Sequence, residues 1–313
     1  KFRLLTVAEG FRPSNTEKHV EPDTGPVTIA PKPHDLDRRD PKRVLLGRVV
    51  NENGDPVARA VIEPFGFAVP NGTQYGGTDE KGIDPLAVSD DEGRFRLGVG
   101  EDGLGVLLNV KAPFLAPVRL KALTAGPDRH TIRLGVGVTI SGRVVKDGKP
   151  LPGLTLGMAQ KDRNSETFVG EFQFATDADG WFHFVNIPPS DVFYLYGLMD
   201  SFRPHGALAA RPVITAGHGS TVELGTIAVE PGCTVSGRLL LSDEKALPPH
   251  TRLMLSGEEA WDVQIVEAGP DGTFRFTGVP AGHYNLGANL RDYHPSKRNR
   301  SLDLLNPFGL LGV

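Results

Sequence analysis

The feature that most constrains this chain is a short motif that returns at a fixed interval. A glycine is followed by arginine and two aliphatic residues at Gly47–Val50, Gly142–Val145 and Gly237–Leu240. Each copy begins 95 residues after the copy before it. Self-similarity at a constant period indicates repeated structural units, and a chain of 313 residues has room for two or three domains. We therefore expect several small cores rather than one large core.

The same order of signals follows each motif. A polar turn comes first, then a second apolar stretch, and then an acidic turn that ends in glycine and leads into alternating apolar residues. These turn and strand segments are Asp91–Leu97, Asp179–Phe184 and Asp271–Phe276. Alternation with a period of two indicates strands whose Phe residues point inward. The 38 Gly and 26 Pro residues recur at short intervals, as turns do in all-β proteins. The pattern predicts an all-β chain of tandem β-sandwich domains.

We expect the repeats to divide the chain into four parts. A partial preceding repeat with a linker would occupy residues 1–42, and three sandwich repeats would follow at 43–135, 136–229 and 230–313. The best candidate for the linker is 32–42, because this stretch is rich in Pro, Asp and Arg.

Both ends of the chain are expected to be cut from a longer protein. Residues 4–7 and 27–29 match 107–110 and 130–132 in order and spacing, which predicts strands of a half repeat at the start. The stretch after Tyr284 lacks a clear closing strand, so the third repeat is expected to be truncated.

The motifs carry a family resemblance. A strand with Gly-Arg-Val, an Asp-Gly-x-Phe strand, and a Val-Pro-x-Gly turn before Tyr-x-Leu resemble carboxypeptidase regulatory-like repeats. The resemblance implies transthyretin-like, Ig-like sandwiches that serve as accessory modules of secreted or cell-envelope proteins, often bacterial, with some relatives among carbohydrate-binding folds. Related adhesin repeats with isopeptide bonds carry a Glu after Tyr-x-Leu, and Gly282–Ala288 lacks it. An isopeptide bond is therefore not expected in the third repeat.

Composition narrows the classes of partner. The formal net charge is -4, with basic and acidic residues interspersed, so no nucleic acid partner is expected. No run of about 20 apolar residues is present, so this fragment is not expected to insert into a membrane. Cys233 is the only cysteine and cannot form an intrachain disulfide.

The motifs that could carry chemistry are weak. Gly98–Gly103 has the letters of a dinucleotide-binding loop, but the residues after it are β-like and offer no helix N-terminus to a phosphate. The acidic turns Asp90–Gly93 and Asp177–Gly180 are typical of tight turns, and calcium binding by them stays open. We predict no catalytic residue, no metal ligand and no cofactor.

Two residues are candidates for ligand binding. Phe182 and Phe184 take the inward positions of their strand, so Trp181 and His183 should face outward. An exposed aromatic ring can stack on a sugar or on a partner, and packing under a neighbouring loop is the alternative. Trp261 shares its parity with Val263 and Ile265 and is predicted to lie in a core.

The leading hypothesis is a non-catalytic spacer or protein-binding module of a larger secreted, periplasmic or cell-surface protein. Its partners would be other domains of the parent chain, with protein or polysaccharide at the cell surface. A carbohydrate-binding module that uses Trp181 is the alternative. An enzyme with a site assembled at a repeat junction is the third hypothesis, and converging carboxylates in a deep cleft would be its sign.

Overall fold

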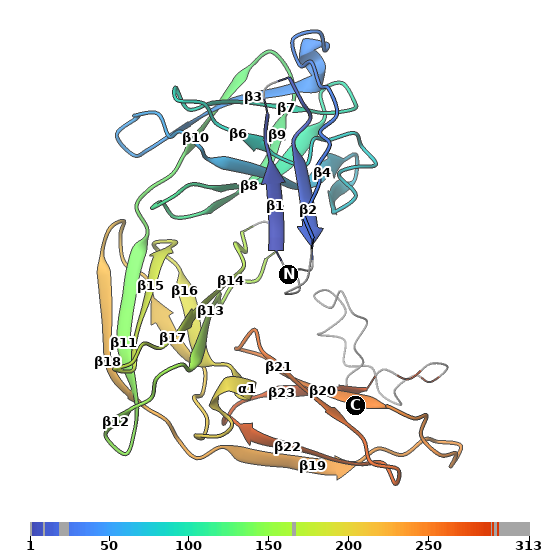
Figure 1. Cartoon of the computed structure of the whole chain (residues 1–313), viewed down its shortest axis with the longest axis vertical. Coiled ribbons are helices and arrows are strands. Elements are labelled where there is room, and N and C mark those ends of the chain that lie inside the picture. Colours follow the sequence, from blue (N-terminus) through green and yellow to red (C-terminus); the bar gives the residue numbers. More distant parts are fainter. Residues whose placement is uncertain are drawn as a thin grey trace.

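The computed structural model describes residues 2–8, 10–18, 25–164, 167–288, 290 and 293. Strands make up nearly all of the regular structure, which confirms the all-β class (Figure 1). The described helices are the 3₁₀ turn η1 (Pro41–Arg43) and the single-turn helix α1 (Met199–Phe202). No helix in these described ranges is long and apolar enough to cross a membrane. Three groups of strands follow one another along a curved path in Figure 1.

The N-terminal segment is a hairpin. Strand β1 (Phe2–Thr6) pairs antiparallel with β2 (Ser14–Lys18). The strand expected at 27–29 is absent, because the backbone there makes no ladder, and only an isolated bridge joins Phe11 to Pro33 farther along. That expectation was wrong.

The first unit comprises β3 to β10. One sheet has the order β10-β3-β7, and the other has the order β5-β4-β8-β9 with β6 paired to β4. Buried aliphatic and Phe side chains from both sheets form one core. The strands are β3 (Val44–Val50), β4 (Val61–Val69), β5 (Gly72–Tyr75), β6 (Ala87–Val88), β7 (Arg94–Gly98), β8 (Gly105–Lys111), β9 (Val118–Thr124) and β10 (Arg129–Arg133).

The second unit comprises β11 to β18. Its first sheet has the order β12-β11-β15 with β18 parallel to β11, and its second has the order β14-β13-β16-β17. A second separate core lies between them. The strands are β11 (Val138–Lys146), β12 (Lys149–Pro150), β13 (Thr155–Gln160), β14 (Glu171–Ala175), β15 (Trp181–Ile187), β16 (Val192–Gly197), β17 (Arg211–Ile214) and β18 (Thr221–Ala228).

The third unit comprises β19 to β23. Strand β19 pairs with β22, and a second sheet has the order β21-β20-β23. Its core is smaller than the other two. The strands are β19 (Cys233–Arg238), β20 (Arg252–Gly257), β21 (Val263–Glu267), β22 (Thr273–Val279) and β23 (Tyr284–Ala288). The closing region expected to be truncated falls mostly on residues 294–313, outside the described residues.

The three Gly-Arg motifs make the same contacts in all three units. Each glycine lies opposite the first Phe of the Asp-Gly-x-Phe strand, in the pairs Gly47–Phe95, Gly142–Phe182 and Gly237–Phe274. A Cβ on Gly142 would lie 2.7 Å from a ring carbon of Phe182, so the ring packs where any side chain would stand. The glycine is therefore required by the close approach of the aromatic ring.

The arginine of the motif holds the acidic turn. Its Nε donates to a turn carbonyl in each unit, from Arg48 to Glu92 at 3.0 Å, from Arg143 to Asp179 at 2.7 Å and from Arg238 to Asp271 at 2.6 Å. The motif thus fixes the turn that starts the Phe strand. The Gly-Arg motif therefore recurs because each unit needs the same packing at this turn.

The prediction that Trp261 lies in a core was wrong. Trp261 is 44% exposed, and Val263 and Ile265 of edge strand β21 are also exposed. The buried position of β21 is Gln264, whose amide donates to the carbonyl of Thr277 at 3.2 Å. Its Nε2 is thus paired whereas its buried Oε1 has no hydrogen-bond partner, and the apolar residues Val263 and Ile265 lie on the outward face of β21.

Candidate functional site

Trp181 and His183 form an aromatic plate on the outer face of β15. Phe182 and Phe184 are buried beneath it, whereas Trp181 is 41% exposed and His183 is exposed. The two outward rings stack with centroids 6.4 Å apart and planes 14° apart. Both side chains thus point outward, as the alternation predicts.

Polar groups surround this plate on the neighbouring strand. Strand β11 places Arg143 opposite Trp181 and Ser141 opposite His183. The guanidinium carbon of Arg143 lies 5.8 Å from the Trp181 ring centroid, and parallel pairing sets Glu223 beside Ser141. A flat aromatic surface with hydrogen-bonding groups at its edge can stack on a ring and bind its hydroxyls.

The acidic turns use their carboxylates internally. Asp90 accepts hydrogen bonds from the backbone N–H groups of Glu92 and Arg94, at 3.0 and 2.7 Å. Asp177 accepts in the same way from Asp179 and Trp181, at 3.0 and 2.8 Å. These bonds cap tight turns. Among the described residues no group of three or more potential metal ligands converges.

The junction of the second and third units contains a half-buried carboxylate that the sequence did not single out. Asp262 Oδ2 accepts a hydrogen bond from the backbone N–H of Met199 at 2.6 Å, and Oδ1 accepts one from Val263 at 2.8 Å. Asp262 therefore satisfies the first free N–H of α1, and burial raises the pKa of its carboxyl.

A second carboxyl lies close to the same junction. The Tyr196 hydroxyl donates to Glu171, and burial raises the pKa of both groups. The nearby charge of Asp262 adds to the rise in the pKa of Glu171. Burial also raises the pKa of Tyr284, across the junction, to about 12. Each of these groups is held in its neutral form more firmly than it would be in water.

The cavity at this junction is small. Its volume is about 20 Å³, and Tyr196, Met199, Asp262 and Tyr284 are among its lining residues. A space of that size holds one water molecule. The cavity is too small for a substrate, and its lining residues form a contact between the second and third units.

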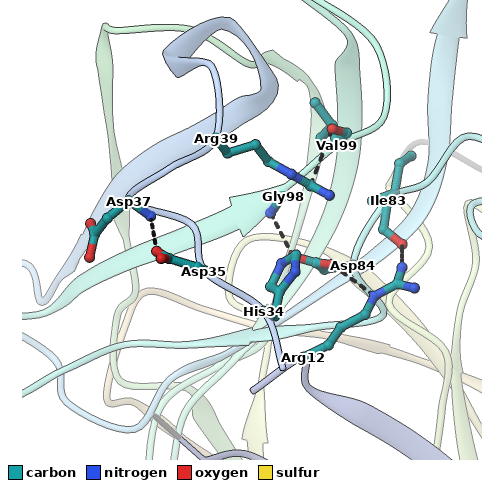
Figure 2. A network of polar contacts seen from close by, with 9 residues as sticks. All are labelled: Arg12, His34, Asp35, Asp37, Arg39, Ile83, Asp84, Gly98 and Val99. Carbon is teal, nitrogen blue, oxygen red and sulfur yellow. Dashed lines mark hydrogen bonds and ion pairs between the residues drawn. The ribbon is translucent and has the colours of Figure 1, made fainter. Parts of the chain in front are cut away.

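A polar network joins the N-terminal segment to the first unit (Figure 2). The Asp84 side chain is 2% exposed and accepts hydrogen bonds from Arg12 at 3.0 Å and from the Gly98 backbone N–H at 2.8 Å. His34 Nε2 lies 2.8 Å from Asp84 Oδ2, the oxygen that also accepts from Gly98. We refer to Arg12, His34 and Asp84 as the Asp84 clasp. The only signal for it in the sequence is an acid between Ile83 and Pro85.

The comparisons with known proteins add little to this description. No protein-family model matches the chain, and no curated protein matches it.

The chain shows weak likeness to solved structures of pilins and of one Bacillus anthracis protein. The Bacillus anthracis TIE protein is 14% identical over 82% of this chain and 46% of that chain, with a TM-score of 0.25. A streptococcal ancillary pilin is 13% identical over 79% of this chain and 90% of that chain, with a TM-score of 0.23. The minor pilin of Streptococcus agalactiae is 12% identical over 60% of this chain and 97% of that chain, with a TM-score of 0.30. The all-β assignment rests on this chain's own strands.

Proposed function

We propose that this chain is a non-catalytic structural and interaction module of a larger secreted or cell-envelope protein. It would consist of tandem carboxypeptidase regulatory-like sandwiches at 43–135, 136–229 and 230–313, preceded by a partial repeat and linker at 1–42. Its role would be to hold neighbouring domains of the parent protein at a fixed distance and to present surfaces to partners.

The observation that carries this proposal is the position of Met199. This residue belongs to α1 of the second unit, yet it is 2% exposed and packs in the core of the third unit with Leu253, Leu255 and Phe276. Full burial of a methionine side chain stabilises by about 1.5–3 kcal/mol. A side chain inserted into the next core opposes independent rotation of the two units, as a stiff spacer requires.

Phe168 supports the same reading, because it contacts both neighbouring units. Its carbonyl accepts a hydrogen bond from Arg119 of the first unit at 2.5 Å. Its ring lies 5.1 Å, centroid to centroid, from Trp261 of the third unit, and Arg163 lies over the same Trp261 ring at 5.1 Å. One loop of the second unit therefore ties the three units together.

Small-angle scattering of the whole chain tests the proposal. We expect the profile to fit one curved arrangement of the three units, and Met199→Ala combined with Trp261→Ala to increase the radius of gyration. Ile214→Ala, at a side chain that is 73% exposed, is the matched control and should leave the profile unchanged. A wild-type profile that requires freely rotating units would contradict the spacer role.

Carbohydrate binding is a second candidate function, favoured by the Trp181 and His183 plate. A sugar ring would stack on Trp181, and its hydroxyls would bind Ser141, Arg143 and Glu223 at the edge of the plate. We expect a glycan array to give signals that Trp181→Ala abolishes and that Val185→Ala, on the same face and 56% exposed, retains. An array without signals would rule against this second function.

A further inference from the structure

A cleft lies between the N-terminal segment and the outer face of the β10-β3-β7 sheet of the first unit. Its volume is about 670 Å³. Val7 and Pro13 line it from the N-terminal side, and Leu46, Arg94, Arg96 and Arg129 line it from the sheet. It is far larger than the water-sized cavity at the junction of the second and third units.

The strand register concentrates arginine on this sheet face. Arg129, Leu46 and Arg96 form one cross-strand row, and Thr131, Arg48 and Arg94 form the next. The arginines are all exposed, whereas the residues between them along β7 and β10 point inward or are partly buried. The corresponding outward residues of the third unit, including Thr273 and Arg275, form no such array.

Two of these arginines form ion pairs with carboxylates of the chain itself. Arg96 pairs with Asp37 at 2.5 Å, and Arg94 pairs with Asp90 and Glu92 of its own turn. The Asp37 side chain is 84% exposed, so this ion pair is weak and can be displaced. Arg129 is exposed and makes no ion pair with any described residue. Guanidinium groups bind carboxylates through paired hydrogen bonds.

The Asp84 clasp anchors the segment that carries Pro13, a residue of the opposite wall of this cleft. Arg12 precedes the lining residue Pro13, and its Nη2 also donates to the carbonyl of Ile83 at 3.0 Å. Arg39 donates to the carbonyl of Val99 at 3.3 Å, and Figure 2 shows Arg12 and His34 directed at Asp84. The N-terminal wall is therefore anchored to the sheet rather than free to move away.

We propose that this cleft binds an extended acidic peptide of a partner protein, with carboxylates at alternate positions. Side chains two residues apart on a strand are about 6.7 Å apart on one face. Arg94 and Arg96 have this spacing on β7, and so would the carboxylates of an extended peptide laid across them. Leu46, in the row between Arg129 and Arg96, and Val7 and Pro13 opposite it, would contact the apolar residues of the peptide.

The lining favours a peptide over other polyanions. Sugars and nucleic acid bases use exposed aromatic rings as stacking platforms. The one aromatic residue in the lining, Phe95, is 3% exposed and belongs to the core. The inference rests on the interaction part of the proposed function and names the chemistry of the partner.

Fluorescence anisotropy with the whole chain tests the inference. The probe is a labelled octapeptide that alternates Glu with Thr, and an isomer of the same composition with contiguous Glu residues is its control. We expect the alternating peptide to bind more tightly than the isomer. Arg96→Ala combined with Arg129→Ala should weaken its binding about tenfold or more, since two charge-assisted contacts are lost.

Arg275→Ala is the matched control, because Arg275 lies opposite Ser236 as Arg96 lies opposite Leu46. If the double variant unfolds, Arg129→Ala alone carries the test, because that exposed side chain has no ion pair among the described residues. Equal binding by the arginine variants or by the isomer would overturn the inference. Tighter binding of polygalacturonate or oligothymidylate would overturn it as well. If the peptide does not bind but the scattering profile fits fixed units, the inference is overturned and the proposed spacer function is retained.

Discussion

The glycines of the repeated motif are set by the aromatic rings opposite them. In the second unit, Gly142 faces Phe182 across the β11–β15 ladder, and both are fully covered. The same pairing recurs in the other two units. At the scale of single residues, the motif is therefore a packing device whose failure should be measurable as lost stability.

Gly142→Ala should destabilise the second unit by about 1–3 kcal/mol, the usual cost of overpacking a core. The added Cβ would lie 2.7 and 2.9 Å from two carbons of the Phe182 ring. Urea unfolding followed by Trp181 fluorescence, in a Trp261→Phe background, measures the change. Gly217→Ala is the control, because nothing lies within 4 Å of that added atom. Equal stability of the two variants would refute the packing role.

The Asp84 clasp makes a second prediction at this scale. Asp84→Ala removes the acceptor of the Gly98 N–H and the partner of Arg12 and His34, which should cost about 2–4 kcal/mol. Hydrogen exchange should then lose protection over residues 25–42. Asp37→Ala, at an exposed ion pair, should change stability by less than about 1 kcal/mol. Protection unchanged in Asp84→Ala would show that other contacts hold this segment.

Between elements, α1 and the loop before β21 form a contact between the second and third units. Half-buried Asp262 caps Met199, and Glu171 lies close enough for its pKa to respond to the charge of Asp262. Burial penalises both charged forms, so the ionised junction is less stable than the protonated one. The contact between units is therefore expected to depend on pH.

The direction of that dependence follows from linkage. The pKa of Asp262 is higher in the folded chain than in the unfolded chain, because burial disfavours its charge. Its contribution to stability is therefore complete below the unfolded pKa of about 4 and is lost as pH rises through the folded pKa. Asp262→Asn keeps an acceptor for Met199 and should reduce the fall in stability as pH rises above about 4.

Thermal unfolding across this pH range measures the effect. Asp128→Asn is the control, because Asp128 is an exposed residue between β9 and β10 of the first unit and should leave the pH profile close to that of the wild type. A slope in Asp262→Asn identical to the wild-type slope would exclude Asp262 as its source.

The sequence predicted the elements better than their contacts. Local alternation correctly predicts that Phe182 points inward and Trp181 outward, because successive side chains of a strand point to opposite faces of the sheet. Alternation gave the wrong face for β21, because the buried residue there is Gln264, a polar residue. Met199 and Asp262 meet across 63 residues, and Arg12 and Asp84 across 72, so no local pattern reveals them. The junctions and the arginine-lined cleft became visible only once the register of the strands was known.

At the scale of the whole molecule, side-chain contacts hold the three units in a fixed relation to one another. The first unit contacts the second through Arg119 and Phe168, and the second contacts the third through Met199, Asp262 and Trp261. Side chains on both sides of each boundary are ordered by these contacts. A chain built this way should behave in solution as one curved body, as Figure 1 draws it.

The most direct test is a spin-label distance measurement between the second and third units. Cys233 is free and exposed, and Val185→Cys, at a side chain that is 56% exposed, supplies the second attachment site. We predict a single narrow distance distribution that broadens in Met199→Ala. A broad wild-type distribution, unchanged by Met199→Ala, would contradict the claim that the units are held together by the inserted methionine.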